Sequence, residues 1–277
     1  MGGWLTCLAA CATIQKVIES IASDWRAVSA IAGLALFFIW ESLAPFLAPE
    51  QRRLHAARNL TIASANVFLV GACCAGATVA VAKVTAAMGL GVLFQGSLST
   101  AARVVLGFLL LDLWTYWWHR GNHRWPLLWR FHRMHHSDPS LDVTSAVRFH
   151  SGELLLSAGL RLLLIPLFGL PLAALVLYDG VVVAATQFHH ANIGLGDRTD
   201  TLVRFLVVSP NMHKLHHSQL RIETDSNYAT VFSCWDRLFG TYRQRENYGE
   251  IHFGLPDLDG ERFQTVKGLI LTPFRRL

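Results

Sequence analysis

The sequence predicts an all-α integral membrane protein of about four to five transmembrane helices, the last two a short hairpin, with a cytosolic helical cap. Of its 277 residues, 52% are hydrophobic and only 16% are charged, whereas soluble domains average about 25% charged residues. Several apolar stretches approach the roughly 20 residues that cross a bilayer. Eleven of the 13 histidines lie between positions 119 and 217, at the ends of these stretches or between them.

The N-terminal hundred residues are expected to form a unit of membrane helices, residues 1–100. Residues 1–23 begin with an apolar run that no basic residue precedes, which favours a short amphipathic or membrane-entering helix over a cleaved signal peptide. A first span is expected at about 28–48 and a second at about 62–82, with a polar, arginine-rich loop at 49–60 between them. Ala, Gly and Val dominate the second span, and small residues let helices pack closely in lipid.

A third span, at about 102–118, ends in Trp and Tyr residues typical of a membrane boundary. Residues 154–188 are again apolar, and Pro166, Gly169 and Pro171 divide them into a hairpin of two short spans. Arg161 lies inside this hairpin and is expected to be paired or near the boundary. Arginines concentrate at 49–60 and after the third span, so the positive-inside rule places both on the cytoplasmic side. Residues 191–277 contain no further span.

Three histidine patterns predict a metal site. One is HxxxH and two are HxxHH, spaced so that their members share one face of a helix. We therefore expect each pattern to present its imidazoles in one direction. The eight histidines are His119, His123, His132, His135, His136, His213, His216 and His217. Eight imidazoles exceed the four ligands of a structural zinc site and fit two metal ions with positions left open.

The chemistry of the metal is partly constrained. Imidazole suits iron and zinc alike, and clustered histidines with few cysteines argue against an iron–sulfur site. A solvated histidine-rich surface is the alternative, but two HxxHH boxes beside an HxxxH pattern favour a metal. Asp112 lies on the same helical stripe as His119 and His123. The carboxylate of Asp112 is expected to orient an imidazole or to bind metal itself. The alternative is a buried carboxylate whose hydrogen bonds come from a neighbouring helix.

The chain is similar to the fatty acid hydroxylase / sterol desaturase superfamily over about residues 105–245. The resemblance rests on DLWTYWWHRGNH (112–123), HRMHHS (132–137), SPNMHKLHHS (209–218), and Asn227-Tyr228 followed by WDRLFGT (235–241). It implies a fatty acid hydroxylase-like catalytic domain at 101–245 and a C-terminal cytosolic tail at 246–277. It further implies a di-iron centre on the cytosolic face, with O2 as co-substrate. Zinc can replace the two irons in purified protein.

The resemblance implies specific roles for individual residues. The eight histidines of the three patterns become metal ligands, with His190 as an additional ligand and His189 as its rival. Asp112, His150, His189 and Asn192 are expected as further ligands or as groups that orient the ligands. His150 belongs to an element resembling the family's His-x-x-Glu, which ends here at Glu153. Catalytic groups beyond the metal ligands are not assigned.

The resemblance implies an oxidoreductase that hydroxylates or desaturates a lipid C–H bond. Sterol, fatty acyl chain, ether lipid, carotenoid and aminolipid all remain open as substrates. Because nothing resembles a fused electron-transfer domain, electrons are expected from a separate ferredoxin or cytochrome b5-like protein with its reductase. The net charge of +5 is attributed to Lys and Arg beside anionic lipid, with no nucleic acid partner. The compact architecture favours a bacterial inner membrane. A metal-storing or metal-transporting membrane protein and a hydrolytic zinc enzyme are the alternatives.

Overall fold

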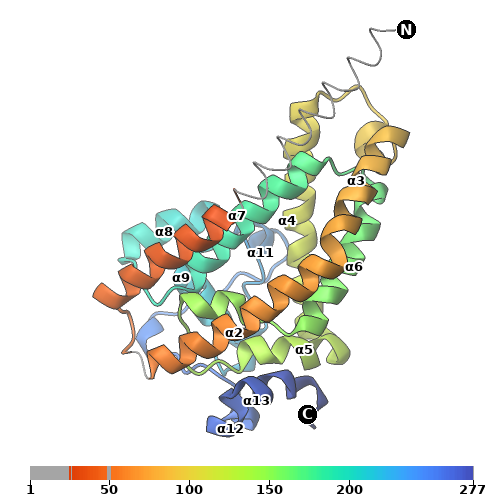
Figure 1. The fold of residues 1–277 in the computed structure, drawn as a ribbon. Helices are drawn as coiled ribbons and strands as arrows, with labels where there is room; N and C mark the ends of the chain where they lie inside the picture. Colours follow the sequence, from red (N-terminus) through yellow and green to blue (C-terminus); the bar gives the residue numbers. More distant parts are fainter. Residues whose placement is uncertain (1–24, 26, 49–50, 277) are drawn as a thin grey trace, which may run out of the picture.

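A computed structural model describes residues 25, 27–48 and 51–276, and expectations for residues 1–23 lie outside this part. The described chain is a helical bundle without a strand, in which long helices lie side by side and short ones close one end (Figure 1). The longer helices are Ala27–Leu43, α2 (Arg52–Val70), α3 (Gly76–Met88), α4 (Thr100–Arg124), α5 (Pro126–His136), α6 (Ser151–Phe168), α7 (Leu172–His190) and α8 (Asp197–Leu206). The shorter ones are α9 (Pro210–His216), α10 (Arg221–Thr224), α11 (Cys234–Leu238), α12 (Glu261–Gln264) and α13 (Val266–Ile270).

Three helical runs are long and apolar enough to cross a membrane: Arg52–Phe94, Ser151–Phe168 and Leu172–His190. The helix Ala27–Leu43 is apolar but shorter. α4 has 25 residues and packs along α7, yet it carries charged residues within its length and ends in a polar stretch. The expected all-α membrane architecture is confirmed, whereas the number of spans stays a prediction.

Two expected boundaries in the N-terminal half are wrong. The first apolar helix ends at Leu43 rather than near 48, because Pro45 disfavours helical backbone at the residue before it. The expected loop at 49–60 is helical from Arg52 onward. That helix continues through a π-helical turn, Gly71–Ala75, into α3 and ends at Gly89, whose φ of 60° is left-handed. The polar residues near 52–60 therefore occupy the first turns of a long helix.

The expected hairpin at 154–188 is present as α6 and α7. α6 ends at Gly169, which adopts a left-handed φ of 73° and reverses the chain. Pro171 precedes the first turn of α7, and its fixed φ suits that position. Arg161 on α6 forms an ion pair with Asp179 on α7. The charge of Arg161 is thus paired, and the hairpin returns the chain to its starting end at His190.

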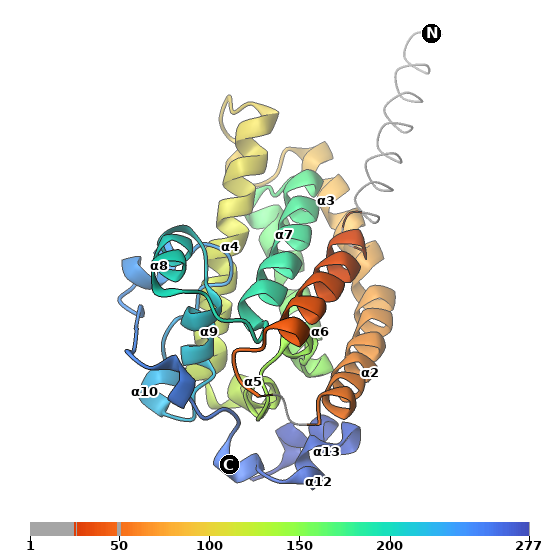
Figure 2. The same cartoon turned by 90° about the vertical axis from the view of Figure 1, so that its left-hand side faces the viewer.

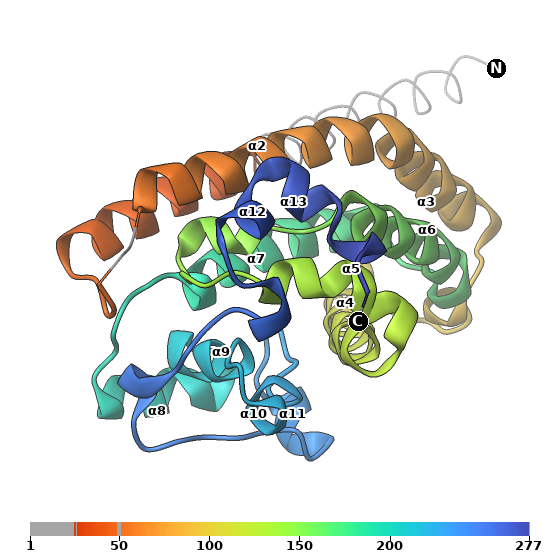
Figure 3. The same cartoon turned by 90° about the horizontal axis from the view of Figure 1, so that it is seen from below.

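The histidine-bearing elements gather at one end of the bundle. α5, α9 and α10 lie at the end opposite the α6–α7 turn (Figure 2). Seen from below, α12 and α13 lie across α2 near α5 (Figure 3). Arg133 of α5 fastens this segment, because its guanidinium donates to the carbonyls of Thr272 and Arg275 at 2.6 and 2.9 Å.

The close approach of α4 and α7 depends on Gly107. A Cβ atom at this position would lie 2.9 Å from the Cβ of Ala174, closer than carbon atoms pack. We expect Gly107→Ala to lower the free energy of unfolding by about 1–3 kcal/mol, as overpacking does. Gly159→Ala is the matched control, since nothing lies within 4 Å of its new Cβ. Because alanine favours a helix over glycine, this variant should have an unchanged or higher free energy of unfolding. Chemical unfolding in detergent measures both, and equal effects would contradict the packing argument.

Candidate metal centre

Four helices bring histidine side chains to one place. α4 and α7 each end in a histidine pattern, while α5 and α9 are short helices that carry the HxxHH boxes. Among the described residues, the imidazoles form two groups in which one nitrogen of each ring lies within 4.8 Å of the others. The first, called the five-histidine group, contains His119, His123, His132, His136 and His216. The second, called the four-histidine group, contains His135, His190, His213 and His217.

Each HxxHH box contributes to both groups, so the expectation that a box points in one direction is wrong. In α5 the i, i+4 pair His132 and His136 joins the five-histidine group, and His135 joins the other. The box of α9 is divided in the opposite sense, with its i, i+4 pair in the four-histidine group and His216 in the five-histidine group. Neighbours along a helix are rotated by about 100° about its axis, so His135 and His136 project toward different groups.

Most rings of the five-histidine group are held by their outward nitrogens. Nδ1 of His119 lies 2.8 Å from the carbonyl oxygen of Tyr228, and Nδ1 of His216 lies 2.7 Å from that of Ser226. Nδ1 of His132 lies 2.9 Å from a carboxylate oxygen of Glu153. A ring that donates through Nδ1 has a free lone pair on Nε2. These three contacts therefore direct Nε2 toward the centre of the group.

In the four-histidine group the Nε2 atoms converge. The Nε2 of His190 lies 3.1 Å from that of His135 and 3.0 Å from that of His213, which in turn lies 3.2 Å from that of His217. With metal–nitrogen bonds of about 2.0–2.1 Å, two ligands at right angles around one ion lie about 3 Å apart. The observed separations fit ligands of a shared ion.

The ionisation of these rings also fits metal binding. Burial, followed by the positive charge that neighbouring rings would add, holds the pKa of His136, His213 and His217 well below its usual value. Neutral imidazole is the form that binds a metal. Ring nitrogens such as His132 Nε2, His216 Nε2 and both nitrogens of His136 are buried without a protein partner. Buried polar atoms normally have partners, so a metal ion is the ligand this donor set suits.

The structure distinguishes His190 from His189. His190 lies in the four-histidine group, and its Nδ1 bonds the carbonyl of Thr186 at 2.7 Å. His189 packs against His213 with ring centroids 4.0 Å apart but lies outside both groups. The nine residues expected as ligands are thus the nine that the structure brings together, and their binding of metal stays a prediction.

Asp112 requires a correction. Its carboxylate contacts none of the histidines in any described hydrogen bond and instead accepts from the Nε1 of Trp235 at 2.7 Å and from the backbone of Phe232 at 3.1 Å and Val231 at 3.3 Å. Asp112 therefore ties α4 to the segment that follows Tyr228. The expected alternative, a buried carboxylate satisfied by its neighbours, describes it.

His150 and Asn192 also lie outside both histidine groups. His150 caps α6, accepting from Gly152 N at 3.0 Å, and its Nε2 faces the carbonyl of Ile270. The side-chain amide of Asn192 exchanges two hydrogen bonds with the backbone of Leu47. Both side chains fasten segments around the site rather than pointing into it.

Glu153 has the role that the sequence suggested for Asp112. One of its oxygens accepts from His132 Nδ1 and from the side chain of Asn122 at 3.0 Å. Asp225 approaches His123 in a similar way, with its carboxylate 3.6 Å from Nδ1. A carboxylate that accepts a hydrogen bond from the other ring nitrogen of a ligand histidine fixes the orientation of the ring and raises its basicity. The His-x-x-Glu pattern was the available signal, but its glutamate rather than its histidine reaches the centre.

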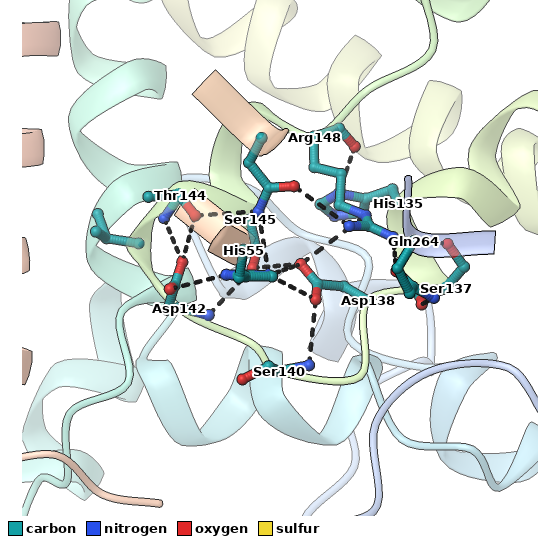
Figure 4. Close-up of polar contacts among 12 residues, drawn as sticks. His55, His135, Ser137, Asp138, Ser140, Asp142, Thr144, Ser145, Arg148 and Gln264 are labelled. Carbon is teal, nitrogen blue, oxygen red and sulfur yellow. Dashed lines mark hydrogen bonds and ion pairs between the residues drawn. The ribbon is translucent and has the colours of Figure 1, made fainter. Parts of the chain in front are cut away.

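A network of charged side chains lies beside the HxxHH box of α5 (Figure 4). His55 of α2 lies between two carboxylates, with Nε2 2.8 Å from Asp138 and Nδ1 3.0 Å from Asp142. Nearby, Arg148 donates through Nε to the carbonyl of Met134. The carbonyl of Arg148 in turn lies 3.3 Å from His135 Nδ1. The network connects the start of α2 with the end of the histidine box.

Residues 104–241, about half of the chain, match the family model described as fatty acid hydroxylase. This chain belongs to the fatty acid hydroxylase family. It is 33% identical to an ornithine lipid hydroxylase of Rhizobium tropici over 142 residues, which cover 51% of this chain and 42% of that protein. It is 29% identical to the alkylglycerol monooxygenase of Homo sapiens over 157 residues, which cover 52% of this chain and 32% of that protein. It is 27% identical to the cholesterol 25-hydroxylase of Rattus norvegicus over 144 residues, which cover 51% of this chain and 47% of that protein.

The matched stretch spans less than half of each of these three relatives. Residues 104–241 of this chain contain both histidine groups, because all nine histidines lie between His119 and His217. No solved structure matches this fatty acid hydroxylase family member.

The two groups predict which neighbouring histidine binds metal. We expect His190→Gln to reduce bound metal from about two ions per chain to about one, because it removes a member of the four-histidine group. His189→Gln should retain both ions, since its ring lies outside the groups. Mass spectrometry of purified, iron-reconstituted protein measures this. Loss of metal from the His189 variant and retention in the His190 variant would reverse the assignment.

The network around His55 predicts a non-additive effect on stability. His55→Ala leaves Asp142 buried without a cation and Asp138 with only Arg148, at 3.9 Å, and we expect a loss of about 3 kcal/mol or more in the free energy of unfolding. Adding Asp138→Asn removes one of the two repelling charges, so the double variant should lose less than the sum of the single losses. His252→Ala, an exposed histidine, is the control. Strictly additive losses would argue against the charge network.

Proposed function

We propose that this chain is a di-iron membrane oxidoreductase that uses O2 to hydroxylate, or alternatively desaturate, a C–H bond of a lipid. The observation that carries the proposal is the pair of buried histidine groups at one end of an apolar helical bundle. Nine imidazoles exceed the three protein ligands typical of a hydrolytic zinc site. The three relatives are named for the hydroxylation or monooxygenation of an ornithine lipid, an alkylglycerol and cholesterol.

In this proposal each histidine group would hold one iron, which would supply the activation of O2 toward an unactivated C–H bond. The chain itself provides neutral nitrogen donors in fixed orientations. Glu153 and the backbone carbonyls of Tyr228 and Ser226 orient the rings of the five-histidine group. Burial of the rings excludes water, which protects a reactive oxidant from side reactions.

Hydroxylation would follow the balance R–H + O2 + 2e⁻ + 2H⁺ → R–OH + H2O. The electrons would come from a separate ferredoxin or cytochrome b5-like protein. The substrate would be a membrane lipid, because apolar helices α6 and α7 lead directly to the histidine groups. We favour hydroxylation because the three relatives bear hydroxylase or monooxygenase names. The histidine groups would face the cytoplasm of a bacterial inner membrane.

Storage or transport of metal is the alternative function. Transport needs polar groups along a path through the bundle, but the charged residues within the apolar stretches have fixed partners. Glu41 pairs with Arg52 and accepts from the backbone of Val143 and Asn192. The hairpin charges pair with each other. These contacts favour the enzymatic proposal over a transport path.

Lipid analysis under 18O2 tests the proposal. Cells expressing the wild-type chain should accumulate a membrane lipid that is heavier by one 18O atom, and the purified protein should contain about two irons per chain. His136→Ala should abolish the product and lower the iron content, because it removes a donor from the five-histidine group. His252→Ala, outside both groups, should retain both. Bound zinc with no iron uptake under anaerobic reconstitution, together with an unchanged lipid profile, would refute the proposal.

A further inference from the structure

An arginine-rich aromatic surface adjoins the five-histidine group. It is formed by Arg124, Trp125, Trp129, Arg130 and Arg221, and is called here the Trp129 surface. The side chain of Arg221 is 68% exposed, and Trp125 is 64% exposed. The surface lies where the end of α4, the start of α5 and α10 meet, at the end of the bundle opposite the α6–α7 turn (Figure 2). An exposed tryptophan beside several arginines marks a candidate contact surface, either for a partner protein or for the membrane boundary.

Trp129 joins this surface to the histidines. Its ring centroid lies 5.2 Å from that of His123 and 5.5 Å from that of His136. On its other side the guanidinium of Arg221 lies 5.7 Å from the Trp129 ring. Arg221 also donates to the carbonyl of His123 at 3.4 Å. A single aromatic side chain thus separates a solvent-exposed arginine from two members of the five-histidine group.

The charge of the surface indicates the kind of partner. Neither Arg124 nor Arg130 forms an ion pair with a carboxylate in the described part of the chain, and Arg130 donates to the carbonyl of Pro273. Arg221 is paired with Asp225. The surface therefore keeps an excess of positive charge around exposed tryptophan. Trp and Arg are the residues that concentrate binding energy in protein interfaces, and excess positive charge attracts an acidic partner.

We propose that the Trp129 surface binds an acidic one-electron carrier protein and that Trp129 carries the electron from it to the five-histidine group. This inference rests on the proposed function, which requires electrons from outside the chain. Each encounter would oxidise the carrier by one electron, which Trp129 would pass to the metal that the five-histidine group would hold. Two encounters, with two protons from solvent, supply what one O2 requires.

An anionic membrane surface would also attract these arginines. Lipid attachment, however, gives no reason for an aromatic ring to contact two imidazoles of the buried group. Docking of an electron carrier gives such a reason, because electron transfer needs a short path between the two redox centres. The contact of Trp129 with His123 and His136 therefore favours the carrier.

Binding is tested without turnover on the full-length protein in detergent. The probes are gallium-substituted plant-type ferredoxin, which cannot transfer electrons, and oxidised cytochrome b5. We expect Arg124→Glu/Arg130→Glu to weaken binding of at least one probe by about tenfold or more, and added salt to weaken wild-type binding. The matched control is Arg53→Glu/Arg198→Glu, which reverses two exposed arginines elsewhere and should change the Kd by less than about twofold.

Three binding results would overturn the proposal. One is equal binding by the wild type and the Arg124→Glu/Arg130→Glu variant. Another is the absence of saturable binding of both probes to the wild type. The third is loss of binding to phosphatidylglycerol vesicles in the variant while carrier binding is unchanged, which would make the surface a lipid contact.

The role of Trp129 is tested by the rate of reduction of the iron-loaded protein. Trp129→Leu should slow reduction by native ferredoxin by about tenfold at saturating ferredoxin, where any change in the Kd of the gallium probe no longer limits the rate, while leaving reduction by dithionite unchanged. Trp129→Phe, which keeps an aromatic ring, should retain most of the rate. An unchanged rate in Trp129→Leu would contradict the path. Absence of lipid product with dithionite in the wild type would count against the proposed function and leave the binding result standing.

Discussion

The structure depends on packing nine imidazole rings against one another where water does not reach. Protonated rings at these distances would repel and would be costly to bury, so the rings are neutral and each needs a partner for its lone pair. The Nδ1 atoms of His119, His132 and His216 find theirs in carbonyls and in the carboxylate of Glu153. The Nε2 atoms of His132 and His216 find none in the protein, and those of the four-histidine group meet only one another. A metal ion in each group would satisfy these lone pairs.

The surroundings of the histidines are arranged to hold those rings in place. Arg148 contacts the carbonyl of Met134 on α5, the hydroxyl of Ser137 and the side chain of Gln264 in α12. One buried guanidinium thereby joins the histidine box, the loop after it and the C-terminal segment. Asp112 likewise connects α4 to the segment whose Tyr228 carbonyl orients His119. Residues distant in the sequence thus fix the rings through their backbones.

The sequence was informative where short-range geometry decides the outcome. Histidine spacing identified eight of the nine residues that converge, the family resemblance added His190, and the breaks at Gly169 and Pro171 identified the hairpin. It failed where a choice depends on contacts between distant segments. Asp112 and Glu153 are both acidic residues near the boxes, and only the packing of α6 against α5 decides which one reaches a ring. The division of each box between two groups likewise depends on where the facing helix lies.

The α6–α7 hairpin lies between the second and third histidine patterns in the sequence, and it supplies His190 itself. During synthesis the ribosome therefore makes two patterns, then a membrane hairpin, then the last pattern. The four-histidine group cannot be complete before His190 and His217 have been synthesised, and the five-histidine group also needs His216. Until then, the histidines of α4 and α5 lack their partners from the last pattern. Assembly of both groups is thus a late event in synthesis, and any metal that they bind would have to enter after the apolar hairpin has been made.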